Sequence, residues 1–321
     1  MARVAVVLAG GTGTRLYPAS TDATPKQFRA FGFDDSLLAR TVDRARACAD
    51  EVYVLTREAF ADRIHEHAPD VGVLVEPEPK DTGPALAYAA RRIDELHDDA
   101  VMLCLPADHH IAGDYAPVFD RATAVARETD GLVTLGVEPT RDATGYGYIQ
   151  PGADHGRYFS VSAFHEKPDA DTAARYREEG YLWNAGIFAW TPEAFLEACE
   201  GTELEPIATA DDPRDGFAAA EAVSVDYAVL ESSDEVLVVP ATFDWDDLGA
   251  WDSLARILEG ENATLGDTLA IDASDNVLAA GEGMSVSALG VSDLVVAAYD
   301  GNVVVLPKSE AQRVREIVES R

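Results

Sequence analysis

Lysine is scarce in this 321-residue chain, which contains only Lys26, Lys80, Lys167 and Lys308. Lysine and arginine together number 25 against 58 aspartates and glutamates, and the formal net charge is −33. Such a chain has no general basic surface for nucleic acid and is not attracted to anionic membranes, so we expect neither partner. An acidic surface suits a halophilic protein, because concentrated salt screens its charges within about 3 Å.

Cysteines and long hydrophobic runs are also scarce. The three cysteines, Cys48, Cys104 and Cys199, form no CxxC pair and cannot build a disulfide framework, so we expect buried, inert thiols. No apolar run approaches the roughly 20 residues that cross a bilayer, and the N-terminal run is too short for a signal peptide. These absences predict a soluble, cytoplasmic protein.

The chain alternates apolar runs with amphipathic stretches at the spacing of βαβ units. The run Val4–Ala9 is continuously apolar, as in a strand buried on both faces. Ser36 is suited to cap a helix over Ser36–Ala47. Further elements are expected as strands at Glu51–Leu55, Val71–Val75 and Val101–Leu105 and as a helix at Thr82–Leu96. The pattern predicts an α/β fold with a Rossmann-like, mainly parallel sheet.

The last part of the chain has a different character. From about residue 262, short β-type runs are separated by Asp, Asn, Ser and Gly turns, and a final helix is expected over Ser309–Glu319. We therefore predict a catalytic α/β domain over residues 1–260 and a small β-rich domain over residues 261–321. The short strands fit either an irregular β-helix or a small sheet.

The first apolar run ends in a glycine-rich loop, Leu8–Leu16 (LAGGTGTRL). Glycines let the backbone curl so that its N–H groups converge on an anion. The loop lacks the Lys-Ser/Thr ending of a P-loop and the third glycine of a dinucleotide fingerprint, and Pro18 prevents an immediate helix. Arg15 and Lys26 add two cations to this segment, which favours a polyphosphate cradle over a purely structural turn.

Asp108 follows the strand expected at Val101–Leu105. Ligands in open α/β sheets collect at the carboxyl ends of strands, so Asp108 is placed where a metal-bound triphosphate could sit. His109 and His110 come next, but no further His or Cys stands at zinc-ligand spacing in the sequence. Oxygen ligands and phosphate favour Mg²⁺ instead.

Lys167 ends another expected strand, with Glu166 before it and Pro168 after it. A lysine kept in so lysine-poor a chain indicates a defined position. Asn184 lies within an aromatic and aliphatic run. Because burying an unpaired amide costs about 1–3 kcal/mol, Asn184 should bind either the backbone or ligand hydroxyls.

A second acidic cluster contains Asp244, Asp246 and Asp247 between tryptophans. One of these carboxylates could hold a single Mg²⁺ together with Asp108. In an acidic protein such a run is normally a solvated surface, but the flanking aromatic residues favour a site. The residues alone do not decide which of the three would serve.

Taken in order, these segments resemble the sugar-phosphate nucleotidyltransferases, above all the members that act on mannose 1-phosphate. The matching motifs, between residues 7 and 251, are LAGGTGTRLYPAS with PKQF, EPEPKDTGPALAYA, LPADHHI, TGYGYI, FHEKPD, WNAGIFAW, SVDYAVLE and DWDDLGAW. The tail, with GVSDLVVA and VVVLPK, resembles the short C-terminal β domain of the same enzymes. Eight motifs in one fixed order are strongly specific for the family.

The resemblance implies an enzyme that transfers GMP from GTP to mannose 1-phosphate, giving GDP-mannose and pyrophosphate. The sugar phosphate would attack the α-phosphorus in line with the help of Mg²⁺, so the protein would supply mainly positioning and charge neutralisation. GTP and the sugar 1-phosphate are then the expected partners. A homodimer is an expectation from the resemblance alone.

The motifs also imply roles for individual residues. The implied catalytic residues are Arg15, Lys26, Asp108, Lys167 and Asp247, of which Asp108 and Asp247 would bind Mg²⁺. The implied nucleotide-binding residues are Leu8, Gly10, Gly11, Thr12, Gly13, Thr14 and Thr82. The implied sugar-binding residues are Gly147, Glu166 and Asn184. Family spacing around the tryptophans selects Asp247, and Lys80 would stand near the base site.

Three alternatives stay open at this point. The chain could use another pair of substrates, such as glucose 1-phosphate with dTTP or UTP. It could be a non-catalytic regulatory subunit that binds sugar nucleotides, although the charged residues of the motifs are all present. A nicotinamide-dependent oxidoreductase fits least, because the glycine loop departs from the dinucleotide fingerprint.

Overall fold

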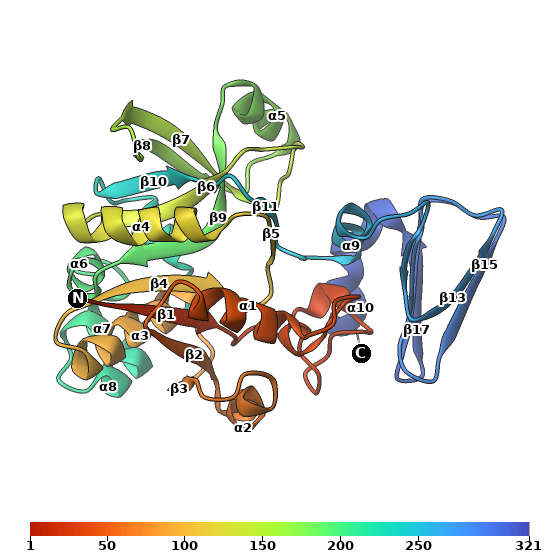
Figure 1. Ribbon diagram of the computed structural model, residues 1–321, viewed down its shortest axis with the longest axis horizontal. Coiled ribbons are helices and arrows are strands. Elements are labelled where there is room, and N and C mark those ends of the chain that lie inside the picture. Colours follow the sequence, from red (N-terminus) through yellow and green to blue (C-terminus); the bar gives the residue numbers. More distant parts are fainter. Residues whose placement is uncertain (321) are drawn as a thin grey trace. The chain divides into compact units, whose positions relative to one another are not determined.

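The structure is a computed structural model that describes residues 1–320 (Figure 1). It divides into two compact units, each built from several chain segments. The first unit comprises residues 1–10, 41–106 and 111–245, and the second comprises residues 11–40, 107–110 and the chain from residue 246 onward. Neither unit is one continuous stretch, and the boundary near residue 260 stays a prediction about domains.

The first unit contains a nine-stranded sheet with the order β3-β2-β1-β4-β9-β6-β10-β8-β7. Its strands are β1 (Ala2–Leu8), β2 (Glu51–Arg57), β3 (Gly72–Glu76), β4 (Ala100–Pro106), β6 (Leu132–Val137), β7 (Gly147–Asp154), β8 (Phe159–Glu166), β9 (Leu182–Trp190) and β10 (Val236–Pro240). In this sheet only β8 and β9 run against the common strand direction. The prediction of an α/β fold with a mainly parallel sheet is confirmed.

Helices cover the sheet of the first unit: α4 packs against β4, β6 and β9, whereas α3 packs with α6, α7 and α8 (Figure 1). The helices of this unit are α2 (Glu58–His67), α3 (Thr82–Leu96), α4 (Ala116–Thr129), α5 (Ala170–Glu178), α6 (Pro192–Ala198), α7 (Glu205–Thr209), α8 (Pro213–Ala219) and the π-helix η3 (Asp226–Leu230). Three elements lie where the chain passes from one unit to the other: α1 (Leu37–Arg46), β5 (His110–Ala112) and β11 (Asp244–Asp246). Ser36 caps α1 through its hydroxyl, as the sequence predicts.

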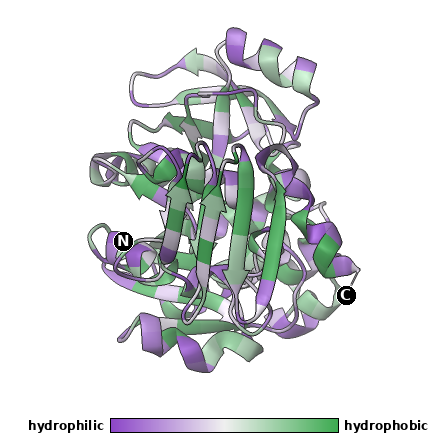
Figure 2. Ribbon diagram, turned by 90° about the vertical axis from the view of Figure 1, so that its right-hand side faces the viewer, coloured by the Kyte–Doolittle hydropathy of each residue, from purple (hydrophilic) through white to green (hydrophobic). Residues whose placement is uncertain are grey.

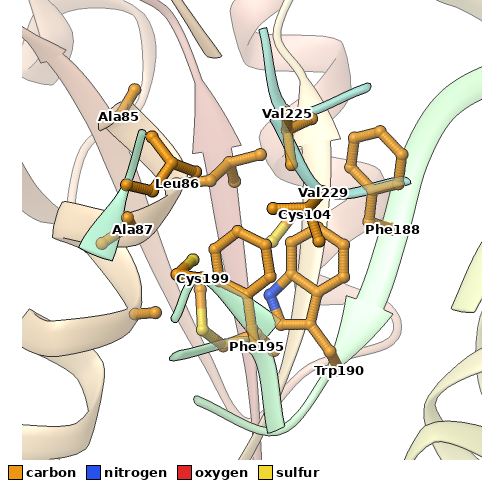
Figure 3. Close-up of a cluster of buried hydrophobic side chains, with 14 of the residues drawn as sticks. Ala85, Leu86, Ala87, Cys104, Phe188, Trp190, Phe195, Cys199, Val225 and Val229 are labelled. Carbon is orange, nitrogen blue, oxygen red and sulfur yellow. The ribbon is translucent and has the colours of Figure 1, made fainter. Parts of the chain in front are cut away.

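The core between the sheet and α3 combines aliphatic side chains with several aromatic ones (Figure 3). Trp190 and Phe195 stack with ring centroids 4.2 Å apart, and both are fully buried. Cys104 and Cys199 lie in the same cluster, and burial raises the pKa of the Cys199 thiol to about 12. All three cysteines are buried and unbridged, which confirms the prediction of buried thiols.

The second unit contains two sheets whose strands alternate along the chain. One sheet holds β12 (Ala263–Leu265), β14 (Val277–Ala280), β16 (Leu294–Tyr299) and β17 (Asn302–Pro307), and the other holds β13 (Asp267–Ile271) and β15 (Ser285–Leu289). Apart from β17 the paired strands are parallel. Leu278, Val286 and Ala298 belong to a core that packs these strands together. This is the expected β-rich, β-helix-like domain, and Figure 2 shows hydrophobic residues along its strands.

A second core of this unit joins segments that are far apart in the sequence. The remaining elements of the unit are η1 (Thr14–Leu16), η2 (Lys26–Phe28), α9 (Trp251–Ile257), η4 (Lys308–Arg313) and α10 (Val314–Glu319). Leu16 and Leu37 pack in one cluster with Trp251, Val277 and Val314. The N-terminal loop segment is therefore supported by the C-terminal strands and helices.

The predicted C-terminal helix over Ser309–Glu319 is wrong in its first half. Residues Lys308–Arg313 form the 3₁₀-helix η4, and only α10 is α-helical. Ala311 and Val314 are both buried, and a 3₁₀ turn places residues three apart on one side, which brings both into the core. Helices α4, α7, α8 and α9 and the π-helix were not predicted. No helix among residues 1–320 is both long and apolar enough to cross a bilayer.

Candidate active site

The glycine-rich loop begins directly after β1 and packs against Lys26. Gly13 has a φ of 66°, in the left-handed region that favours glycine. A Cβ at Gly13 would lie 2.6 Å from Lys26 Cβ, so a side chain there would displace the lysine. The Lys26 amide donates to the carbonyl of Thr12 at 3.4 Å. The loop and Lys26 are thus brought together within the second unit.

Lys26 is a buried cation between two aspartates. Its side chain is only 4% exposed, and its Nζ donates to Asp108 Oδ2 at 2.8 Å and to the backbone carbonyl of Asp247 at 2.6 Å. Burial disfavours ionisation of Asp108, but the charge and hydrogen bond of Lys26 outweigh it and hold the pKa of Asp108 below its usual value. The structure therefore brings Lys26, Asp108 and Asp247 together.

The three carboxylates of the second acidic cluster have different surroundings. Asp246 is buried and bound, because its carboxylate accepts from Arg256 Nε at 2.7 Å and from the Leu248 amide at 2.9 Å. Asp244 is exposed. Asp247 is partly buried, and a Cβ at Gly249 would come within 2.4 Å of its Oδ2. The local turn is therefore shaped around the Asp247 carboxylate.

His109 and His110 lie beside this cluster without forming a zinc site. Burial, and then the charge of Lys26, lower the pKa of His109, while nearby Asp108 and Asp247 oppose the shift. The His110 ring stacks on Phe33 with centroids 5.4 Å apart. Within residues 1–320 no three His, Cys, Asp or Glu side chains are grouped to hold a metal ion by themselves.

Arg15 lies elsewhere on the loop. Its Nη1 donates to Gln312 Oε1 of η4 at 2.8 Å, so its guanidinium is directed toward the C-terminal helices in this structure. The predicted contact of Arg15 with a triphosphate stays a prediction.

The expected sugar-binding residues meet in the first unit, near the ends of β7, β8 and β9. Glu166 has a 5% exposed side chain, and its Oε2 lies 3.1 Å from Lys167 Nζ, which is the more exposed partner. A Cβ at Gly147 would lie 2.3 Å from Glu166 Oε1 and 3.3 Å from Asn184 Cβ, so glycine is needed to admit the carboxylate. Lys167 has a φ of 48°, which is uncommon for a residue with a Cβ. Gly147, Glu166, Lys167 and Asn184 thus form one group.

A buried carboxylate that was not predicted, Glu76, ends β3. Its Oε1 lies 3.6 Å from Arg57 Nε at the end of β2, and a Cβ at Gly10, after the end of β1, would lie 2.7 Å from the same oxygen. Burial raises the pKa of Glu76, and Arg57 partly opposes the shift. The carboxyl ends of β1, β2 and β3 meet here, next to the predicted Leu8 and Gly10. The sequence signal for this residue was an acidic residue directly after an apolar strand, in the EPEPK motif.

Thr82 and Lys80 have structural partners in the same unit. Thr82 Oγ1 accepts from the Val225 amide at 3.1 Å. Lys80 Nζ donates to the carbonyls of Phe217, Ala218 and Ala220 at 2.8, 2.9 and 3.0 Å, which caps the C-terminal end of α8. An ammonium at this end also complements the helix dipole. Lys80 therefore holds the end of α8, and its place near a base stays a prediction.

Replacing Lys80 by methionine should lower the free energy of unfolding by about 1–3 kcal/mol, because three carbonyls lose a charged donor. The catalytic rate should stay close to the wild-type value. Chemical denaturation measures the first quantity and a rate assay the second. Glu78→Gln is the matched control, because Glu78 is 52% exposed and its ion pair with Lys80 contributes little. Wild-type stability of the methionine variant would contradict the capping role.

Comparisons with known proteins agree with this architecture. The family model described as nucleotidyl transferase matches residues 4–263, and the model described as a mannose-phosphate isomerase/GMP-like β-helix domain matches residues 266–320. The xanthan biosynthesis protein XanB of Xanthomonas campestris is 36% identical over 98% of this chain and 72% of its own. A mannose-1-phosphate guanylyltransferase of Salmonella montevideo is 34% identical over 98% of this chain and 73% of its own.

A solved structure from Thermus thermophilus, described as a mannose-1-phosphate geranyltransferase, has a TM-score of 0.91 at 32% identity. It covers 100% of this chain, and 99% of that chain is covered in return. The chain therefore belongs to the nucleotidyl transferase family, as the motifs predicted, and is an enzyme of that class rather than a nicotinamide oxidoreductase. Within the family, it is similar over nearly its full length to enzymes named mannose-1-phosphate guanylyltransferase.

Proposed function

We propose that this enzyme transfers GMP from GTP to mannose 1-phosphate, releasing pyrophosphate and forming GDP-mannose. The observation that carries the proposal is the meeting of Lys26, Asp108 and Asp247 around one buried ammonium. Two carboxylates and a cation beside a glycine-rich loop suit a metal-bound triphosphate. The choice of mannose 1-phosphate as the sugar substrate and of guanine as the base rests on the names of the relatives.

The donor set in the second unit fits Mg²⁺. Mg²⁺ usually takes one or two protein carboxylates and completes its shell with water and substrate phosphates, so a site without a third protein ligand is ordinary. Asp108 and Asp247 are the residues that would hold it, while Asp246 is bound to Arg256. When bound, Mg²⁺ supplies charge neutralisation and polarisation of the phosphate that is attacked.

The chain's own cations support the same reaction. Two anions, the triphosphate and the sugar phosphate, must approach each other, and like charges raise the barrier unless they are neutralised. Lys26 has one ammonium hydrogen beyond its two protein bonds and can donate it to a phosphate oxygen. Lys167 is 56% exposed and can neutralise the sugar phosphate while its ion pair with Glu166 holds the ammonium in place. Glu166 and Asn184 would bind sugar hydroxyls.

Glu76 supports GTP as the nucleotide. Guanine offers two N–H donors on one edge, and a carboxylate offers two acceptors. Uracil and thymine offer a carbonyl in the corresponding region, which a buried carboxylate would repel. The position of Glu76 at the carboxyl ends of β1 to β3, beside Leu8 and Gly10, suits a base subsite.

Replacing Glu76 by glutamine should lower kcat/KM for GTP by about 10- to 100-fold, because one charged hydrogen bond to guanine is lost. The preference for GTP over UTP should shrink at the same time. Initial rates with both nucleotides measure the change, and the thermal midpoint checks the fold. A lower midpoint with unchanged nucleotide preference would show that Glu76 serves only its ion pair with Arg57.

The proposed function is tested by pyrophosphate release across a panel of nucleotides and sugar 1-phosphates, in Mg²⁺ and molar KCl. GTP with mannose 1-phosphate should give the highest kcat/KM. Preference for a pyrimidine nucleotide would refute the guanylyl assignment. Tight binding of GDP-mannose without turnover of any pair would identify a regulatory subunit instead.

A further inference from the structure

One motif that matches the family, SVDYAVLE, has no part in the reaction proposed above. In the first unit it forms the π-helix η3, which begins at Asp226. π-Helical turns are rare and frequently occur at functional sites. Val225, directly before Asp226, and Val229, three residues after it, are buried in the core beside α3 (Figure 3). Packing therefore fixes the backbone that carries Asp226.

The first turn of α3 holds the same segment. The Val225 amide donates to Thr82 Oγ1 at 3.1 Å, and the Gly83 amide donates to the Val223 carbonyl at 3.0 Å. A Cβ at Gly83 would lie 2.6 Å from that carbonyl, so the close approach depends on glycine. The chain entering Asp226 is thus anchored on two sides.

Asp226 orients Asn184, one of the expected sugar-binding residues. Asn184 Nδ2 donates to Asp226 Oδ1 at 2.7 Å. Asn184 Oδ1 accepts from Thr134 Oγ1 at 2.9 Å and from the Gly186 amide at 3.1 Å. Because Asp226 accepts on the Nδ2 side of Asn184, and Thr134 and Gly186 donate on the Oδ1 side, only one orientation of the Asn184 amide satisfies all three bonds. These bonds use one of the two Nδ2 hydrogens, and the second can serve a sugar hydroxyl.

Asp226 also belongs to the charged group around Lys167. Glu166 and Lys167 face it from the end of β8, and Tyr227, whose ring centre lies 5.8 Å from Lys167 Nζ, comes from its own helix. Glu231, at the end of the same helix, accepts from the Glu166 amide at 3.2 Å. The α3 residues bonded to this segment are uncharged. Burial, and then the charge of Glu166, raise the pKa of Asp226 to about 7.

We propose that Asp226 is a positioning residue for the sugar 1-phosphate: it fixes the Asn184 amide and sets the electrostatic potential that Lys167 presents to the phosphate. The proposal rests on the proposed function. With Asp226 protonated, Lys167 is opposed by Glu166 alone. With Asp226 ionised, two carboxylates oppose one ammonium, and a phosphate dianion binds less well. Affinity for the sugar 1-phosphate should therefore fall as the pH rises through neutrality.

The test is a calorimetric titration of the full-length enzyme with mannose 1-phosphate at a series of pH values, for wild type and Asp226→Asn. Asparagine keeps an acceptor for Asn184 and has no charge to lose. The wild-type Kd should rise about threefold above neutral pH, the size of effect expected for one partly solvated charge. In the Asp226→Asn variant this rise in Kd should be absent. The only pH dependence left should come from ionisation of the sugar phosphate itself, whose pKa is near 6.

Thr134→Val is the matched control, because it removes the other side-chain partner of Asn184 without touching Asp226. It should weaken binding of mannose 1-phosphate about 10-fold at every pH and keep the wild-type pH dependence. The KM for GTP should stay unchanged in both variants. A wild-type pH profile in Asp226→Asn, or equal increases in the KM of both substrates, would overturn the proposal.

The two proposals fail in distinguishable ways, because the titration does not depend on turnover. A wild-type enzyme that binds mannose 1-phosphate but releases no pyrophosphate would refute the proposed reaction, and the pH profiles would still decide the role of Asp226. Absence of binding to mannose 1-phosphate would refute both.

Discussion

Replacing Asp108 or Asp247 by asparagine is expected to lower kcat by about 1,000-fold while the protein stays folded. The Asp108→Asn amide keeps an oxygen for Lys26, and Asp247 accepts from Lys26 through its backbone carbonyl in either case. Neither amide has a charge with which to hold Mg²⁺ against two phosphates. Pyrophosphate release measured over a range of Mg²⁺ concentrations should also show a higher Mg²⁺ requirement. The thermal midpoint should change little, because Asp108 and Asp247 are both partly exposed.

The same acidic segment offers two controls. Asp244→Asn changes an exposed carboxylate and should leave the rate at the wild-type value. Asp246→Asn removes the ion pair with Arg256. It should lower the free energy of unfolding and leave kcat at saturating GTP and Mg²⁺ close to the wild-type value. Near-wild-type rates in both the Asp108 and the Asp247 variants would refute the metal assignment.

Replacing Lys26 by methionine should lower kcat by about 100- to 1,000-fold, since a preorganised cation at the phosphates is lost. The effect should be large because the ammonium is buried and leaves Asp108 without its cation. Single-turnover measurements at saturating GTP and Mg²⁺ would separate this loss from weaker nucleotide binding.

Lys80→Met is the matched control for this substitution, because it removes the same charged group from the end of α8. It should reduce stability and leave the rate unchanged. If both lysine variants lost stability to the same extent and both kept the wild-type turnover, Lys26 would be a structural cation as well.

The sequence predicted those parts of the fold that local patterns encode. Continuous apolar runs marked β1 and β4, and Ser36 marked the start of α1, because burial on both faces and helix capping leave a signature within a few residues. The π-helix at Asp226 left no such signature. Its shape depends on contacts with Thr82 and the core, which lie far away in sequence.

The choice among the acidic residues shows the same limit. Residue type and spacing could not separate Asp246 from Asp247, because the difference arises from Arg256, which binds one of them. Glu76 was missed since its neighbours are far away in sequence: Gly10 follows β1, and Arg57 ends β2. Lys80 was placed near a base by its motif, whereas its contacts are the carbonyls that end α8. Tertiary partners decide all three.

The shared core of the second unit has a consequence for how the enzyme is made. The segment that carries Lys26 is synthesised early, yet Leu16 and Leu37 pack against Val277, Val295 and Val314, close to the end of the chain. Because synthesis runs from the N-terminus, this loop has no native support until residues 277–314 have left the ribosome. A chain that stops before residue 277 could form strands of the large sheet, but its glycine-rich loop would still lack the residues on which it rests.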